Sequence, residues 1–428
     1  MSAQYRIPRG TFDSLPVEPK PQNLWKQSDR WHHLERTIRA LAFDYRFAEI
    51  RTPLFEQADL FVRGVGEASD IVSKEMYLFS DKGGRSMALR PEGTAPVMRS
   101  VIENRLDMLE GCRKLFYIGP FFRHDRPQAG RFRQFRQFGV EAIGDPSPER
   151  DFEAIDMLLE LYRRLGLSHL KVMLNSLGDG ETGIRYAESL RTFLRPHLSS
   201  LSPESRVRFD KNPLRILDTK DEEEQALLTD APAITDMLDP DSKRHFDTVC
   251  TLLTKGGIAF EVTPKLVRGL DYYNRTVFEV ISDVPGGQNA IGGGGRYDGL
   301  SILLGGPPIP AVGYSTGMER ILQTMERQKC FFPEPEGPEV CLILLGTVAQ
   351  EACLSYLYSL RHAEISAEVC FCAKIRKGLQ LAYRVRAGYA VIVGEEELRS
   401  EKAQIKNMGT EEVVYVELKN IISFFKKS

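Results

Sequence analysis

The feature that most constrains the fold is an arginine-rich segment at residues 121–141. Apolar residues lie at both of its ends, and the turn formers Pro127 and Gly130 lie near its middle. This order predicts two strands joined by a charged turn, and therefore a β-hairpin in an antiparallel sheet. The arginines of the segment are Arg123, Arg126, Arg131, Arg133 and Arg136.

The positive charge of this segment is local, because the whole chain has a formal net charge of -2 at pH 7. A chain so close to neutral is not a general basic binder of nucleic acid, although local patches can still bind RNA. Arginine keeps its charge and presents a planar set of donors that fits phosphate oxygens. Taken alone, the segment fits a phosphate-binding hairpin and an ordinary solvated loop equally well.

Length and composition indicate a globular protein of more than one domain. The 428 residues exceed one ordinary core, and 42% apolar and 27% charged residues are typical of soluble proteins. The seven cysteines include no CxxC pair and no Cys/His cluster with zinc spacing, so we assign no metal to a protein residue. No signal core and no apolar run of about 20 residues is present, which predicts a cytoplasmic protein without a membrane span.

The patterning changes along the chain. Hairpin signals dominate the first part, a helical and charged stretch lacks strand signals, and regular strand–helix alternation follows a segment rich in Pro and Glu. We therefore expect an α+β protein with a largely antiparallel sheet and a second, smaller α/β domain. The expected ranges are 1–177 and 258–330 for two parts of one core, 178–257 for a helical insertion, 331–338 for a linker and 339–428 for the last domain.

Three other clusters could carry chemistry. In residues 89–94 (LRPEGT), Glu92 and Thr94 could contact a ligand or could cap the helix that begins there. Residues 268–275 (RGLDYYNR) combine arginine, an acid and paired tyrosines before a strand, which fits a polar pocket or a surface turn.

The third cluster joins the glycine run at residues 292–295 to residues 313–320. Four glycines in succession allow a close backbone approach to a ligand, but they equally fit a flexible turn. They do not form a P-loop, because no Lys-Ser/Thr pair follows at the required step. Arg320 lies in the first turns of the helix expected at residues 318–328 and could also form a surface ion pair.

In their order and spacing, these clusters resemble the class II aminoacyl-tRNA synthetases, and specifically the histidyl-tRNA synthetase family. The long helix expected at residues 21–45, the short strand after it and Pro53 resemble the first class II motif. The arginine hairpin resembles the second motif and residues 317–320 the third. Residues 268–275 and 293–299 match two peptides peculiar to the histidine enzymes, and the resemblance spans essentially the whole chain.

The resemblance implies a class II antiparallel-sheet catalytic core with a helical insertion and a C-terminal α/β anticodon-binding domain. It implies that histidine is activated with ATP and Mg²⁺ to histidyl-adenylate and transferred to the 3′ end of histidine tRNA, with no tightly bound cofactor. It further implies a homodimer. The alternative is a synthetase-like regulatory or tRNA-sensing protein without acylation activity, which the presence of Arg123, Arg268, Arg320 and the last domain disfavours.

The resemblance also assigns roles to residues of this sequence. Arg123 and Arg268 are the expected catalytic cations at the α-phosphate, and Arg123, Phe135 and Arg320 are expected to bind ATP. The expected contacts to histidine are Glu92, Thr94, Gln137, Glu141, Arg268, Tyr272, Tyr273 and Tyr297. Arg126 and Gln128 are expected to contact the tRNA acceptor end.

Overall fold

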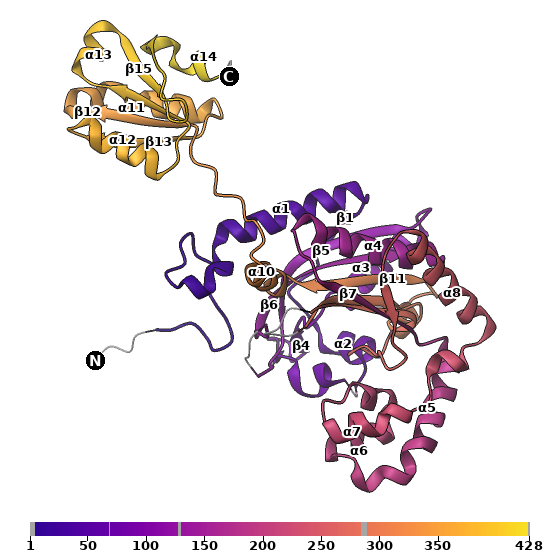
Figure 1. Cartoon of the computed structure of the whole chain (residues 1–428). Coiled ribbons are helices and arrows are strands. Elements are labelled where there is room, and N and C mark those ends of the chain that lie inside the picture. The colour runs from indigo at the N-terminus through magenta and orange to yellow at the C-terminus, as the bar shows by residue number, and fades with distance from the viewer. Residues whose placement is uncertain (1–4, 68, 127–129, 284–288, 427–428) are drawn as a thin grey trace. The chain divides into compact units, whose positions relative to one another are not determined.

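The computed structural model describes residues 5–67, 69–126, 130–283 and 289–426 (Figure 1). The chain divides into two units, Met1–Phe332 and Pro333–Ser428. The division falls inside the segment rich in Pro and Glu. Within the described residues, no helix has the length and apolar character needed to cross a membrane.

The first unit is organised around an eight-stranded sheet of order β1-β5-β6-β11-β10-β9-β7-β8. In this order, every pair of neighbours from β5 through β6, β11, β10 and β9 to β7 is antiparallel. The two outer pairs, β1 with β5 and β8 with β7, are parallel. The strands are β1 (Ala48–Glu49), β5 (Arg113–Phe122), β6 (Gln134–Ile143), β7 (Leu170–Ser176), β8 (Phe260–Val262), β9 (Asn274–Ser282), β10 (Ala290–Arg296) and β11 (Ala311–Gly317). The predicted α+β class with a largely antiparallel sheet is therefore confirmed.

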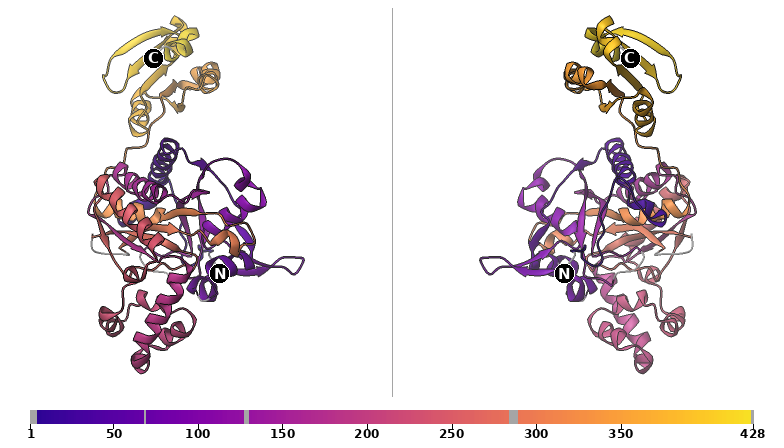
Figure 2. Two further views of the ribbon diagram at one scale, coloured as in Figure 1. Left: turned by 90° about the vertical axis from the view of Figure 1, so that its right-hand side faces the viewer. Right: turned by 90° about the vertical axis from the view of Figure 1, so that its left-hand side faces the viewer.

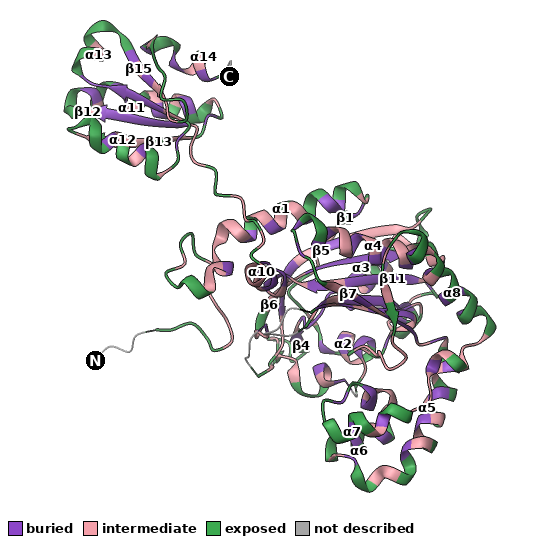
Figure 3. Ribbon diagram, viewed as in Figure 1, coloured by how far each residue is buried: buried purple, intermediate pink, exposed green. Residues whose placement is uncertain are grey.

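Helices cover one face of this sheet, and part of the other face lines a cavity. The helices α1 (Ser28–Asp44), α4 (Pro148–Arg164), α8 (Pro240–Lys255) and α10 (Met318–Arg327) contribute side chains to one buried apolar cluster with the sheet. Figure 3 shows the strands of the sheet as mostly buried. On the other face, α3 (Thr94–Glu103) packs beside a second cluster that contains Tyr117, Tyr272 and Tyr297.

Two smaller parts flank the main sheet. The strands β2 (Phe55–Gln57), β3 (Leu78–Ser80) and β4 (Ser86–Leu89) form an antiparallel sheet next to α2 (Ala58–Val65). The helices α5 (Gly180–Leu194), α6 (Pro203–Lys211) and α7 (Glu222–Leu227) surround an apolar core of their own together with the 3₁₀ helix η5 (Pro213–Asp218). This core explains why a stretch without strand signals folds as a helical unit.

The second unit has a five-stranded sheet of order β13-β12-β14-β15-β16. β13, β12 and β14 are parallel and the last two strands are antiparallel, which fits the predicted α/β pattern with a partly parallel sheet. The strands are β12 (Val340–Leu345), β13 (Ala367–Cys372), β14 (Tyr389–Val393), β15 (Lys402–Asn407) and β16 (Val413–Glu417). The helices are α11 (Gly346–His362), α12 (Ile375–Arg384), α13 (Glu395–Ser400) and α14 (Ile421–Phe425).

The glycine run is a buried strand and not a flexible turn. β10 contains all four glycines and lies between β9 and β11 in the middle of the sheet. A Cβ atom at Gly294 would collide with the carbonyl oxygen of Gly313 on β11, so only glycine lets these backbones approach so closely. Residues 313–317 of the same sequence cluster belong to the adjacent strand β11.

Two expected helices are interrupted. The helix expected at residues 21–45 is a 3₁₀ helix, η1 (Pro21–Lys26), followed by α1, because Gln27 between them is extended. The helix that the sequence places directly after residues 89–94 is α3, which ends at Glu103, and Arg105 then adopts a left-handed conformation with φ of 54°.

Candidate active site

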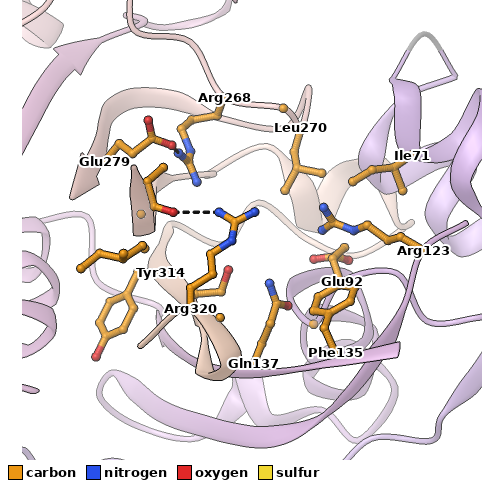
Figure 4. Close-up of a pocket in the computed structure, with 18 of the residues that line it drawn as sticks. Ile71, Glu92, Arg123, Phe135, Gln137, Arg268, Leu270, Glu279, Tyr314 and Arg320 are labelled. Atoms are coloured by element: carbon orange, nitrogen blue, oxygen red, sulfur yellow. Dashed lines mark hydrogen bonds and ion pairs between the residues drawn. The ribbon is translucent and has the colours of Figure 1, made fainter. Parts of the chain in front are cut away.

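A cavity of about 410 Å³ opens on the face of the main sheet that is opposite α1 and α4 (Figure 4). Its lining comes from segments far apart in the sequence: the start of α3, the strands β5 and β6, the loop before β9, the glycine run of β10, and the junction of β11 with α10. The sheet thus collects side chains that the sequence separates by up to some two hundred residues.

Three guanidinium groups converge on this cavity. Arg123 follows β5, Arg268 lies in the loop before β9, and Arg320 lies in the first turn of α10, and all three line the cavity (Figure 4). Nε of Arg123 donates to the carbonyl of Pro91 over 2.9 Å, and its guanidinium lies 5.4 Å from the centre of the Phe135 ring.

The other two arginines are also held in place. Nη1 of Arg320 donates to the carbonyl oxygen of Ala290 over 2.8 Å, and Nη1 of Arg268 forms an ion pair with Oε1 of Glu279 over 2.5 Å. The three positions are therefore fixed by contacts within the protein before any ligand enters.

Burial and neighbouring charges shift the pKa values of these three arginines in different directions. Burial, together with the nearby Arg123 and Arg131, lowers the pKa of Arg320 to about 10, and burial lowers the pKa of Arg123. Burial also acts to lower the pKa of Arg268, but the Glu279 carboxylate outweighs it and the pKa is raised. All three groups stay cationic at neutral pH, and their mutual repulsion favours a ligand with several negative charges.

Two buried acidic residues, Glu92 and Glu141, lie beside the arginines and form what we call the acidic floor. The carboxylate of Glu92 accepts hydrogen bonds from the backbone N–H groups of Thr94 and Ala95, at 2.7 and 2.9 Å. The capping role considered from the sequence therefore falls to Glu92, whose side chain caps α3 while it faces the cavity. Burial raises the pKa of Glu92, against the effect of these hydrogen bonds.

Glu141 lies deeper, behind Thr94. Oγ1 of Thr94 donates to Glu141 Oε1 over 2.8 Å, and the hydroxyl of Tyr297 donates to Oε2. Burial raises the pKa of Glu141 to about 8, despite the hydrogen bonds from Tyr297 and Thr94. A Cβ atom at Gly313, which pairs with Glu141 across the strands, would collide with Oε2, so that glycine makes the room for the carboxylate.

Most of the sequence-predicted site residues gather at this one place. The cavity is lined by Glu92, Thr94, Arg123, Phe135, Gln137, Arg268, Tyr272, Tyr273 and Arg320. Glu141 and Tyr297 are buried directly behind this lining and do not contribute to it. Arg126 is exposed and lies outside the lining, and Gln128 falls outside the described residues.

Gln137 has a specific capacity for binding. Within the described part of the chain its buried Oε1 atom has no hydrogen-bond partner, and Figure 4 shows the side chain directed towards the cavity. A buried acceptor without a donor is costly unless a ligand supplies one. The site therefore offers this oxygen to a cationic or N–H group.

Sequence reasoning missed several residues of the lining. Glu279 forms an ion pair with Arg268, and the carboxylate of Glu319 accepts the backbone N–H of Arg136 over 2.8 and 3.0 Å. The ring of Tyr117 packs against Gly93 and Gly139, where a Cβ atom would collide with it. One signal was available for Glu279, which is a charged residue among the apolar residues of the strand expected after residues 268–275.

Comparisons with known proteins agree with this geometry. The family model described as histidyl-tRNA synthetase matches residues 22–321, and that of an anticodon-binding domain matches residues 339–428. The chain belongs to the histidyl-tRNA synthetase family. The predicted family and its class II architecture are thereby confirmed.

Individual members of this family match the chain over nearly their whole length. The chain is 50% identical over 408 residues to a histidine–tRNA ligase of Protochlamydia amoebophila, covering 95% of this chain and 96% of that protein. It is 44% identical to a histidine–tRNA ligase of Geobacillus sp., covering 99% of both. The crystal structure of apo histidyl-tRNA synthetase from S. aureus matches with 36% identity and a TM-score of 0.82, covering 99% of this chain and 100% of that one.

Proposed function

We propose that this histidyl-tRNA synthetase is an active histidine–tRNA ligase. It joins histidine to histidine tRNA at the expense of ATP, which is converted to AMP and pyrophosphate. The observation that carries the proposal is the convergence of Arg123, Arg268 and Arg320 on one cavity with a buried acidic floor. A site that must bring two anions together needs such fixed cations, and one that must bind an amino group needs the acids.

In the first step, a carboxylate oxygen of histidine attacks the α-phosphorus of ATP, supplied with Mg²⁺ as substrate. A bond forms between that oxygen and phosphorus, the bond to the β-phosphate oxygen breaks, and pyrophosphate leaves with the bonding electrons. Arg123 and Arg268 neutralise the charge that gathers at the α-phosphate. Arg320 binds the distal phosphates, and the adenine ring stacks between Arg320 and Phe135.

Histidine binds in the acidic part of the cavity. Its α-ammonium group donates to Glu92, Thr94 and Gln137, whose unpartnered Oε1 is one of the acceptors. The imidazole ring reaches towards Glu141 and Tyr273, with Tyr272 and Tyr297 enclosing it. A pocket of buried polar groups rejects amino acids that leave those groups unpaired, by factors that can reach ~10⁴.

In the second step, a hydroxyl of the terminal ribose of tRNA attacks the carbonyl carbon of histidyl-adenylate, and AMP leaves. The core parts at residues 1–177 and 258–330 perform both steps, with Arg126 and Gln128 at the acceptor end. The insertion at residues 178–257 contacts the acceptor stem. In the last domain, exposed basic residues of α12, among them Lys377 and Arg384, face the anticodon loop.

A homodimer is supported by exposed apolar side chains on the small sheet. Phe55 is 53% exposed and Leu78 is 59% exposed, and the rings of Phe55 and Phe79 lie 6.1 Å apart. Figure 2 shows the β3–β4 hairpin projecting from the body of the first unit. Burial against a second copy would remove this apolar surface from water.

The direct test is histidine-dependent exchange of pyrophosphate into ATP, followed by acylation of histidine tRNA. An active ligase gives exchange with histidine and no other standard amino acid, and then forms histidyl-tRNA. Folded protein that binds histidine without supporting exchange would instead be a regulatory or sensing protein. Exchange with another amino acid would overturn the assignment of the substrate.

A further inference from the structure

The helical insertion reaches the peptide that carries the histidine-binding residues. Arg215 of η5 donates through Nη2 to the carbonyl oxygen of Gly269 over 2.8 Å. The same guanidinium donates to Oδ1 of Asp271, through Nε over 3.1 Å and through Nη2 over 2.9 Å. One insertion side chain therefore holds both the backbone and a carboxylate of the loop before β9.

Asp271 is a junction between three parts of the first unit. Its Oδ1 also accepts from Nδ2 of Asn212 over 3.0 Å, and its backbone N–H donates to the carbonyl of Val65, at the end of α2, over 3.1 Å. Gly66 has φ of 97°, and a Cβ atom there would collide with Oδ2 of Asp271. Residues 269–271 are therefore held between α2 on one side and η5 on the other.

This junction adjoins the binding residues along the chain. Arg268 immediately precedes Gly269, and Tyr272 and Tyr273 immediately follow Asp271. All three line the cavity, and the two tyrosine rings lie 4.7 Å apart. Because the backbone between them is short, the orientation of residues 269–271 decides where the guanidinium and the hydroxyls point.

The contact combines several hydrogen bonds with partial shielding from water. The side chain of Arg215 is 12% exposed and that of Asp271 is 25% exposed. Ion pairs on open surface contribute little, but a half-buried arginine with several charge-assisted hydrogen bonds is a stronger restraint. Removing the guanidinium takes two hydrogen bonds from the carboxylate of Asp271 and one from the carbonyl of Gly269.

We propose that Arg215 is a positioning residue for the histidine site: the insertion, through Arg215, holds the peptide that presents Arg268, Tyr272 and Tyr273 to the amino acid. The inference rests on the proposed ligase function. It makes histidine binding depend on the docking of the insertion. Arg215 touches no substrate and acts through Gly269 and Asp271.

The test compares Arg215→Ala with a matched arginine of the insertion. Among the residues that the structure describes, Arg206 on α6 donates to the carbonyls of Leu198 and Ser199, both within the insertion. We expect Arg215→Ala to raise the KM for histidine at least about tenfold in pyrophosphate exchange, while the KM for ATP changes by less than about twofold. Arg206→Ala should leave both constants unchanged, and Arg215→Lys should recover part of the loss because it keeps one donor and the charge.

A double-mutant cycle then isolates the pair. Asp271→Asn should raise the KM for histidine by itself, and adding Arg215→Ala to it should cost far less than the product of the two single effects. Thermal unfolding of each variant separates a loss of positioning from a loss of fold. The inference is overturned if Arg215→Ala and Arg206→Ala behave alike, if both substrates are affected equally, or if the two effects simply multiply.

The failure of the proposed function can be recognised separately. If the wild-type chain shows no exchange with histidine, the ligase proposal fails, whatever the variants do. Histidine affinity measured by calorimetry then replaces the KM, and a loss in Arg215→Ala but not in Arg206→Ala still supports the positioning role. Equal affinity in all three proteins rejects it.

Discussion

The buried Glu141 predicts an unusual pH dependence of histidine binding. Burial raises the pKa of this carboxyl group to about 8, so at pH 7 it holds a proton in the free protein. Free histidine loses its imidazole proton near pH ~6.5. A buried carboxylate needs a positive partner, and an imidazolium ring beside Glu141 supplies one when the proton moves from the carboxyl group to the ring.

The magnitude follows from this proton count. Between about pH 6.5 and pH 8, the free protein and the free amino acid together hold the single proton that the complex needs. Above pH 8 formation of the complex must take up a proton at this pair, so the carboxyl group of Glu141 should raise the Kd for histidine about tenfold per pH unit, or roughly eightfold from pH 7.5 to pH 9. Below about pH 6.5 both partners are protonated, and binding must release one proton, which again weakens it.

Titration calorimetry tests this with Glu141→Gln as the matched variant. The glutamine side chain is nearly the same size, cannot ionise and keeps a hydrogen-bonding oxygen. The histidine affinity of the variant should therefore be lower near pH 7.5 and should lack the part of the loss above pH 8 that the carboxyl group causes. The α-amino group of histidine titrates identically in both experiments, so the ratio of the two Kd values removes its effect. Buffers of different ionisation enthalpy should report a proton uptake at pH 9 that is larger in the wild type than in Glu141→Gln by nearly one. The reasoning is refuted if both proteins give the same pH profile.

Three other changes test the rest of the site. Arg268→Ala should lower kcat/KM in pyrophosphate exchange by ~10²–10³ while circular dichroism stays unchanged, and an unaltered rate would remove this arginine from the chemistry. Gly313→Ala forces a Cβ atom against Oε2 of Glu141, so it should lower the free energy of unfolding by about 1–3 kcal/mol and weaken histidine binding, whereas Gly180→Ala, in open space, should do neither. Leu78→Glu should shift the protein from dimer to monomer in sedimentation, and Ile184→Glu, at an even more exposed apolar position on α5, should not; a dimer that survives Leu78→Glu would contradict the proposed interface.

The hairpin of β5 and β6 was predictable because local signals agree there. Apolar residues mark both strands, and turn formers and charges mark the connection. The glycine run was not predictable in the same way. Glycine weakens an isolated strand, and the need for it in β10 arises from close tertiary contacts. One of them is the approach of Gly294 to Gly313 on the next strand, 19 residues further along the chain.

The site itself lay beyond any local pattern. Nothing in the spacing of Arg123, Arg268 and Arg320 requires them to share a cavity, and their joint role came from the family resemblance. The strand order, in which β6 neighbours β11 and β10 neighbours β9, is what brings them together. Contacts such as Arg215 with Asp271 escape sequence reasoning for the same reason, since each partner alone is an ordinary charged residue.

The separation of charge in the cavity fixes the direction in which histidine can bind. Arg123, Arg268 and Arg320 make one side cationic, while the carboxylate of Glu92 makes the other side acidic. An amino acid has an ammonium group and a carboxylate on the same carbon, so it lies with lowest energy across the boundary between the two sides. Its carboxylate then faces the arginines that hold the α-phosphate, which is the approach the reaction needs. The reverse orientation would place ammonium against guanidinium and carboxylate against carboxylate, and the fixed groups of this site strongly disfavour it.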